Sequence, residues 1–181
     1  MEKSMWNLIA LGIVIVATLV LIAGVLFFFH NSNQQSQASQ TVAEISEIVG
    51  NVDTLYQGYN SGYAVISTGG LITAGAFPKN MVVGEQAAGS GTSVDDTWGG
   101  TVTVAPGDTA GANTASQFTL TFNGVPTKAC TNIVVQLEDN ATAVAVNGTT
   151  LTTPVDPTTL ATSCKVTGQG AAGNVLAVSY S

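Results

Sequence analysis

The first third of the chain changes from apolar on all sides to apolar on one side. Residues 8–29 contain no charged side chain. At about 1.5 Å per residue, a helix of this length covers about 33 Å, the thickness of the hydrocarbon core of a bilayer. Beyond residue 40, apolar side chains recur at spacings of three and four, which predicts an amphipathic helix. These side chains are Val42, Ile45, Ile48, Val49, Val52, Leu55 and Tyr56.

The polar residues 31–40 allow two interpretations. They include neither Gly nor Pro, which favours one continuous helix from near the N-terminus to about Gly58, roughly 80 Å long. Glu44 and Glu47 are then expected on the polar side of its second half. The alternative is a membrane anchor, a flexible tether and a separate domain. Its first helix would begin near Thr41, an acceptable N-cap residue with Glu44 three positions later.

After Gly58 the pattern changes from helical to alternating, which predicts half-buried strands. The expected strands are residues 101–104, 118–122, 143–146, 149–151 and 174–180. Asn147-Gly148 separates two of them and predicts a type I′ hairpin turn, because these residue types accept positive φ angles. Residues 57–100 are rich in Gly, Ser and Ala, which indicates a long, partly irregular connection.

Residues 127–137 predict a short helix, with its apolar side chains on one face. They are Ala129, Cys130, Ile133, Val134 and Leu137. This face would place Cys130 against the sheet. The expected fold class is therefore α+β, with a long N-terminal α-helix packed on an antiparallel β-sheet.

The apolar stretch is expected to stay in the working protein. A secretory signal peptide has a shorter apolar part and a small-residue cleavage site, whereas Phe27-Phe28-Phe29-His30 follows here. No Lys or Arg occurs between the span and Lys79. The positive-inside rule then places the N-terminus in the cytoplasm and residues 30–181 outside.

The two cysteines, Cys130 and Cys164, agree with this orientation. An even pair without a CxxC motif in an exported domain usually forms one disulfide. The alternative is two buried free thiols.

Charge and chemistry exclude several function classes. The chain has 11 acidic and 4 basic residues, a formal net charge of −7. Four scattered lysines cannot form the basic stripe that nucleic-acid binding needs. The single histidine, His30, lies at the end of the apolar span, where an interfacial role is expected. Asp95, Asp96 and Asp108 do not match an EF-hand loop. We expect no enzyme, no cofactor and no metal site.

An apolar helix that runs into an amphipathic one, followed by an antiparallel sheet and a late cysteine pair, resembles the ladle-shaped type IV pilins. Several segments are similar to the type IVb group, which includes the bundle-forming pilins, and most of all to the major pilins of thin pili encoded by conjugative plasmids. They are Ala23-Gly24-Val25-Leu26-Phe27-Phe28, Gly75-Ala76-Phe77-Pro78-Lys79-Asn80-Met81, Trp98-Gly99-Gly100-Thr101-Val102-Thr103-Val104 and Gly124-Val125-Pro126. The resemblance spans nearly the whole chain.

The resemblance implies a division of the chain into two parts. Residues 1–30 would be the membrane-spanning and filament-core half of the long helix, and residues 31–181 the extracellular head. Within the head, residues 31–57 would complete the helix, 58–100 form the connecting loop and 101–181 the sheet region. The filament core helix would expose Trp6, Leu8, Ile9, Leu11, Ile13, Val14, Ile15, Val16, Leu19, Val20, Leu21, Ile22, Val25, Leu26, Phe27, Phe28 and Phe29 to neighbouring copies.

The N-terminus departs from the family pattern, in which a short basic leader ends in Gly and the processed chain has Glu at its fifth position. If Trp6 were the first processed residue, Ala10 would stand at the glutamate position. We expect instead that the processed chain begins at Met1, with an N-methylated amine. A carboxylate entering an apolar filament core needs a cation, so Glu2 is the candidate partner for the Met1 amine of a neighbouring subunit.

The resemblance implies a structural protein that forms a homo-oligomeric helical filament. Its partners would be the inner membrane before assembly, a prepilin peptidase, the pilus assembly machinery and a minor tip adhesin. The filament would be an extracellular pilus on a Gram-negative bacterium that serves mating-pair formation in conjugation. The alternatives are an adhesion or auto-aggregation pilus, a secretion pseudopilin, a membrane-anchored periplasmic binding or enzymatic domain, and a lectin-type module.

Overall fold

The computed structural model describes residues 16, 18, 20, 35–84, 89–107, 114–166, 168 and 170–181. Most of the predicted span 8–29 lies outside these residues, and so do residues 31–34. Val16, Thr18 and Val20 are helical. Within the described residues, no helix has both the length and the apolar character needed to cross a bilayer. A continuous helix through residues 31–34 therefore stays a prediction.

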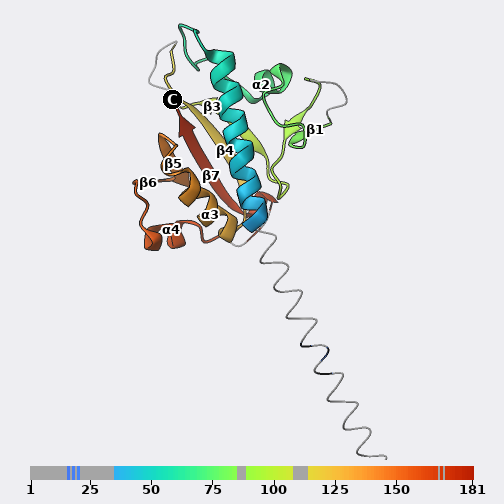
Figure 1. Cartoon of the computed structure of the whole chain (residues 1–181), viewed down its shortest axis with the longest axis vertical. Coiled ribbons are helices and arrows are strands. Elements are labelled where there is room, and N and C mark those ends of the chain that lie inside the picture. Colours follow the sequence, from blue (N-terminus) through green and yellow to red (C-terminus); the bar gives the residue numbers. More distant parts are fainter. Residues whose placement is uncertain are drawn as a thin grey trace, which may run out of the picture. The chain divides into compact units, whose positions relative to one another are not determined.

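A helix over residues 35–56 lies along one side of the head (Figure 1). It buries one stripe of side chains, which are Ala38, Thr41, Glu44, Ile45, Ile48 and Val52. The helix ends before Gly58, whose φ of 85° is a conformation that glycine adopts without strain. Because residues 35–40 are already helical, Thr41 is not an N-cap, and the alternative in which the first helix begins there is wrong.

The expectation that Glu44 lies on the polar side of this helix is also wrong. Its side chain is 6% exposed. On a helix, residue 44 stands one turn from both Thr41 and Ile48, so it belongs to the buried stripe. The residue pattern predicted the stripe, but charge alone suggested the wrong side for this carboxylate. Glu47 is exposed, as expected.

Five antiparallel strands form the main sheet, in the order β3-β4-β7-β5-β6. The strands are β3 (Val102–Pro106), β4 (Phe118–Val125), β5 (Ala143–Val146), β6 (Thr149–Leu151) and β7 (Asn174–Tyr180). Every strand predicted from the alternating pattern is present, with bounds shifted by a few residues at most. Asn147 and Gly148, with φ angles of 50° and 79°, form the predicted turn.

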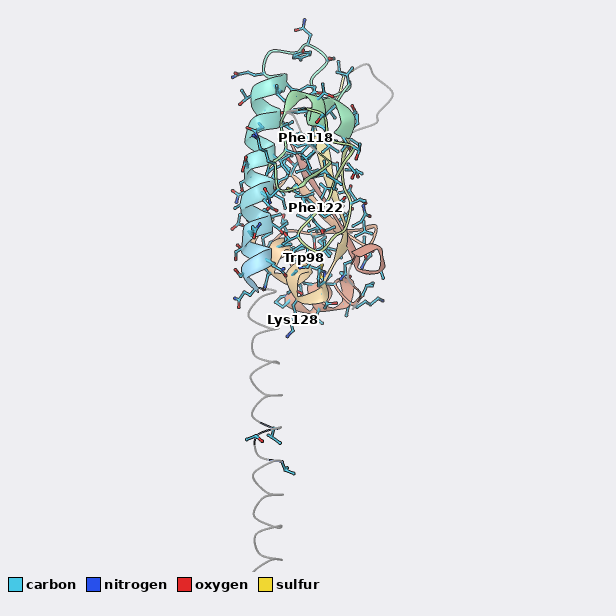
Figure 2. The ribbon with its side chains drawn as sticks, turned by 90° about the vertical axis from the view of Figure 1, so that its right-hand side faces the viewer. Trp98, Phe118, Phe122 and Lys128 are labelled. Atoms are coloured by element: carbon cyan, nitrogen blue, oxygen red, sulfur yellow. A yellow bond between two sulfur atoms is a disulfide. The ribbon has the colours of Figure 1, made fainter. Side chains whose placement is uncertain are left out.

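One face of this sheet carries the core. Along β4, buried Phe118, Leu120 and Phe122 alternate with half-buried residues, and β7 alternates in the same way. Figure 2 shows Phe118 and Phe122 between the sheet and the 35–56 helix. The register of β4 against β7 shifts between Phe122 and Val125. Gly124 lies in this irregularity with φ 84°, and a Cβ there would stand 1.8 Å from the carbonyl oxygen of Gly170.

Among the described residues, three shorter α-helices and the 3₁₀ helix η1 (Gly170–Ala172) complete the head. Helix α3 (Thr127–Leu137) has the predicted bounds and buries the predicted face. Helix α4 (Pro157–Ser163) was not predicted, although Asp156 caps it and Pro157 occupies its first turn. The connection 58–100 holds α2 (Thr68–Ala74) and a small hairpin of β1 (Val82–Val83) and β2 (Ser93–Val94). The α+β class, with a helix on an antiparallel sheet, is confirmed.

Candidate functional site

A disulfide joins Cys130 and Cys164, with 5.9 Å between their Cα atoms. Cys130 lies on the buried face of α3, and Cys164 is the C-cap residue of α4. Both side chains are fully buried. The predicted pairing is therefore confirmed, and the alternative of two free thiols is wrong. A cross-link over 34 residues stabilises the folded chain by about 3–4 kcal/mol in the chain-entropy model.

A buried amide connects the disulfide region to the sheet. Asn174, the first residue of β7, is fully buried. Its Nδ2 donates to the carbonyl oxygens of Val125 (3.0 Å) and Val166 (2.9 Å), and its Oδ1 accepts from the Val166 amide at 3.1 Å. The Asn147 Nδ2 donates to the same Oδ1 at 3.0 Å. Asn174 thus fixes the segment after Cys164 against the end of β4.

A second polar site lies where the 35–56 helix meets the turn at residues 95–100. The Oδ1 atom of Asp96 accepts the backbone N–H groups of Trp98 (2.9 Å) and Gly100 (2.8 Å), which closes the turn. A Cβ at residue 100 would stand 1.5 Å from the carbonyl oxygen of Asn123. The turn therefore needs a glycine at residue 100, because the backbone of β4 packs directly against it.

Polar contacts fasten the helix to this turn. Trp98 Nε1 donates to Gln37 Oε1 at 3.1 Å, and Figure 2 places Trp98 near the N-terminal end of the described helix. The hydroxyls of Thr41 and Thr97 lie 3.4 Å apart. One turn further along, Asn80 Nδ2 donates to Glu44 Oε1 at 2.6 Å.

The electrostatics of this site are unfavourable for two ionised carboxylates. Glu44 Oε2 and Asp96 Oδ2 are buried without a hydrogen-bond partner among the described residues. Burial raises the pKa of Asp96 to about 6, the nearby Asp95 and Glu44 carboxylates add to this rise, and the two backbone N–H donors oppose it. Each ionised oxygen without a donor carries a desolvation penalty.

Aromatic rings gather at the other end of the helix. Tyr56 lies 5.6 Å from both Tyr59 and Tyr63, measured between ring centroids, and Tyr63 lies 4.8 Å from Phe118. Beside them is a shallow groove of about 190 Å³, with exposed apolar side chains at its rim. The groove is lined by Leu55, Tyr56, Tyr59, Val65, Gly70, Leu71 and Ala74.

A protein-family model described as PilS N terminal matches residues 35–179. The chain belongs to this family of pilins. The crystal structure of a type IVb pilin from Salmonella typhi is similar, with 28% identity and a TM-score of 0.58 over 77% of this chain and 97% of that chain. An NMR structure of the type IVb pilin PilS from Salmonella typhi matches with 30% identity and a TM-score of 0.49, covering 79% of this chain and 95% of that chain. A search of curated protein sequences gave no match.

The pilin fold and the type IVb group are thus confirmed, and the chain is a structural subunit of the type IVb pilin class. Among the described residues, no three His, Cys, Asp or Glu side chains form a group that could hold a metal ion. His30 and Asp108 lie outside the described residues.

The residues predicted for assembly fall mostly outside the part of the pilin that the structure describes. Met1, Glu2 and the filament-core side chains are outside it, except Val16 and Val20, which are 61% and 65% exposed. The buried pair Glu44 and Asp96 was not found from the sequence. The Asp-x-x-Gly-Gly pattern at 96–100 carried a usable signal, because a carboxylate preceding such a turn can accept its N–H groups.

Proposed function

We propose that this pilin polymerises through its apolar N-terminal helix into an extracellular type IV pilus. The supporting observation is the apolar character of residues 8–29 on all sides. Such a helix needs lipid before assembly and identical neighbours afterwards. Residues 1–30 then form the filament-core half and residues 31–181 the head. An inner-membrane pool of subunits feeds the filament, and a prepilin peptidase, the assembly machinery and a minor tip adhesin act with it.

The N-terminal amine and Glu2 form the assembly contact in this proposal. The N-methylated amine of Met1 in one subunit pairs with the Glu2 carboxylate of the next, because a carboxylate in an apolar core needs a cation nearby. Glu2→Gln removes this charge and is expected to reduce filament yield at least tenfold. Glu47→Gln, on the exposed side of the head helix, is the control and should leave the yield unchanged.

Whether the helix is continuous through residues 31–34 distinguishes the pilin hypothesis from that of an anchored periplasmic domain on a flexible tether. Ser32→Gly with Asn33→Pro breaks a helix through this segment, since proline removes a hydrogen bond and clashes with the preceding turn. Ser32→Ala with Asn33→Ala keeps it helical. We expect filaments from the alanine variant and none from the glycine-proline variant. Filaments from both variants would contradict a continuous helix and favour a flexible tether.

The biological role proposed for the filament is mating-pair formation in conjugation. Its support is the similarity of the segments around Phe77, Trp98 and Val125 to thin-pilus pilins of conjugative plasmids. The filament would contact recipient cells, and the acidic head would not bind DNA directly. The second candidate is an adhesion or auto-aggregation pilus, and the exposed apolar rim formed by Leu55, Tyr59 and Val65 favours it.

Deletion of this pilin in a donor strain, with the wild-type chain restored in trans, tests the role. For mating-pair formation, transfer frequency in liquid should fall by orders of magnitude and return on complementation. If transfer is unchanged while aggregation or surface attachment is lost, the pilus is adhesive and the conjugation proposal is refuted.

A further inference from the structure

Two buried carboxylates, Glu44 and Asp96, lie at the junction of the 35–56 helix and the β1–β2 hairpin. The hairpin register pairs Val82 with Val94. If this register is extended by two residues on each strand, residue 80 lies opposite residue 96. The hydrogen bond from the Asp95 amide to the Met81 carbonyl, at 2.8 Å, agrees with this extension. Asn80 donates to Glu44, so Glu44 reaches the hairpin beside Asp96. The hydroxyl contact between Thr41 and Thr97, one helical turn earlier, confirms this placement.

Each carboxylate has one oxygen with hydrogen-bond donors and one without. Glu44 Oε1 accepts from Gln40 Nε2 at 2.9 Å and from Asn80, while Glu44 Oε2 has no partner within the described parts of the chain. Asp96 Oδ1 accepts two backbone amides, while none of the described residues donates to Asp96 Oδ2. The two side chains are 6% and 7% exposed. Burial at this depth favours the protonated form of Asp96, and the nearby Glu44 charge adds to this effect.

The charged groups around this pair strengthen the effect. Asp95, on the same turn, is half-buried and adds negative charge. Glu47 lies one turn away on the helix and Lys79 precedes Asn80, but both are exposed, so solvent screens them. From the sheet side, the turn meets Thr101 and Asn123, which do not titrate.

A proton suits the site better than a metal ion. Calcium takes six to eight oxygen ligands. In the part of the chain that the structure describes, no three His, Cys, Asp or Glu side chains form a group that could hold a metal ion. A proton needs no ligand shell. Carried on Asp96 Oδ2, it removes one charge and supplies a hydrogen-bond donor at an oxygen that has no partner among the described residues.

We propose that Glu44 and Asp96 form a proton-operated latch, which holds the 35–56 helix firmly against the 95–100 turn when Asp96 carries a proton and loosens that contact when Asp96 ionises. The pKa of Asp96 is raised from 3.8 to about 6 in the folded chain. The stabilising contribution of the proton is therefore complete below about pH 4 and is lost as the pH rises through about 6. The latch is closed in mildly acidic surroundings and strained at neutral pH.

Trp98 provides the reporter, because it lies in the turn and donates to Gln37 on the helix. The chain has two tryptophans, so Trp6→Phe leaves Trp98 as the single tryptophan, which is excited selectively over the tyrosines. The full-length chain in a mild non-ionic detergent is titrated from pH 4.5 to 8. We expect the Trp98 emission to change with a midpoint near pH 6. The amides of Trp98 and Gly100 should exchange about tenfold faster at pH 7.5 than at pH 5 after correction for intrinsic exchange.

Matched variants identify the groups. Glu44→Gln removes a neighbouring charge and should lower the midpoint, while Glu47→Gln on the exposed side of the same helix should leave it in place. Asp96→Asn should abolish the transition, with circular dichroism to verify folding. Since Glu44→Gln keeps the Asp96 turn intact, it decides the question if Asp96→Asn does not fold.

Three results would overturn the latch. The first is a flat Trp98 titration in the wild-type background. The second is an equal shift from Glu44→Gln and Glu47→Gln. The third concerns calcium: 5 mM CaCl₂, a probe for roughly millimolar affinity, would restore the low-pH emission of Trp98 at pH 7.5 in the wild type but not in Glu44→Gln. This result would assign the site to a cation instead of a proton.

Discussion

Replacement of Asn174 by alanine tests whether a single buried amide holds the disulfide region to the sheet. Four hydrogen bonds are lost, two of them donated to the carbonyl oxygens of Val125 and Val166. The contact with Val125 is fully buried, and an unsatisfied carbonyl there costs about 2 kcal/mol. The groups of Val166 lie near the surface, where water replaces the lost partners at about 0.5 kcal/mol each.

The expected loss of unfolding free energy for Asn174→Ala is therefore about 3 kcal/mol. Urea denaturation of the full-length chain in detergent, followed by circular dichroism with the disulfide intact, measures it. Asn123→Ala is the control, because Asn123 also makes two side-chain hydrogen bonds, to Thr101, but at the surface. It should lose about 1 kcal/mol or less. If both variants lose the same amount, the structural role assigned to Asn174 is refuted.

Three further predictions concern the head. Cys130→Ser with Cys164→Ser should lower the unfolding free energy by about 3 kcal/mol, and an unchanged urea midpoint on reduction of the wild type would show that the cross-link is dispensable. Ile48→Ala in the fully buried stripe should cost about 2–4 kcal/mol, against about 0.5 kcal/mol for Leu55→Ala at the exposed rim; equal thermal shifts would contradict the assigned helix face. Gly50→Ala should stabilise the chain by about 0.5–1 kcal/mol, since the added Cβ would have no described atom within 4 Å apart from the adjacent residues and the helix's own backbone, and a lower melting temperature would mean that residue 50 does not sit in an exposed helix.

Elements with a strong local signal could be predicted from the sequence. Residues 127–137 place five apolar side chains on one helical face, and the observed α3 has these bounds. Asn147-Gly148 determined the hairpin turn because few other residue pairs accept two positive φ angles. The seven-residue helices α2 and α4 are too short for a repeated apolar stripe, so periodicity did not reveal them.

The buried roles of Asn174 and Glu44 could not be predicted, because their partners are distant in the chain. Asn174 contacts Val125, 49 residues earlier, and its position at the start of a strand suggested no special role. Glu44 contacts Asn80, 36 residues later. A buried carboxylate contradicts the usual rule that charged side chains face solvent. Only the three-dimensional structure therefore shows that Glu44 lies on the buried face of the helix.

Filament formation is the central claim, and electron microscopy of material sheared from cells expressing the complete pilus system tests it most directly. Mass spectrometry of the same fraction identifies the subunit and its first residue. We predict thin filaments composed mainly of this chain, beginning at a methylated Met1. Recovery of the chain in the membrane fraction alone, with no filaments in the sheared material, would contradict the assembly proposed for this pilin.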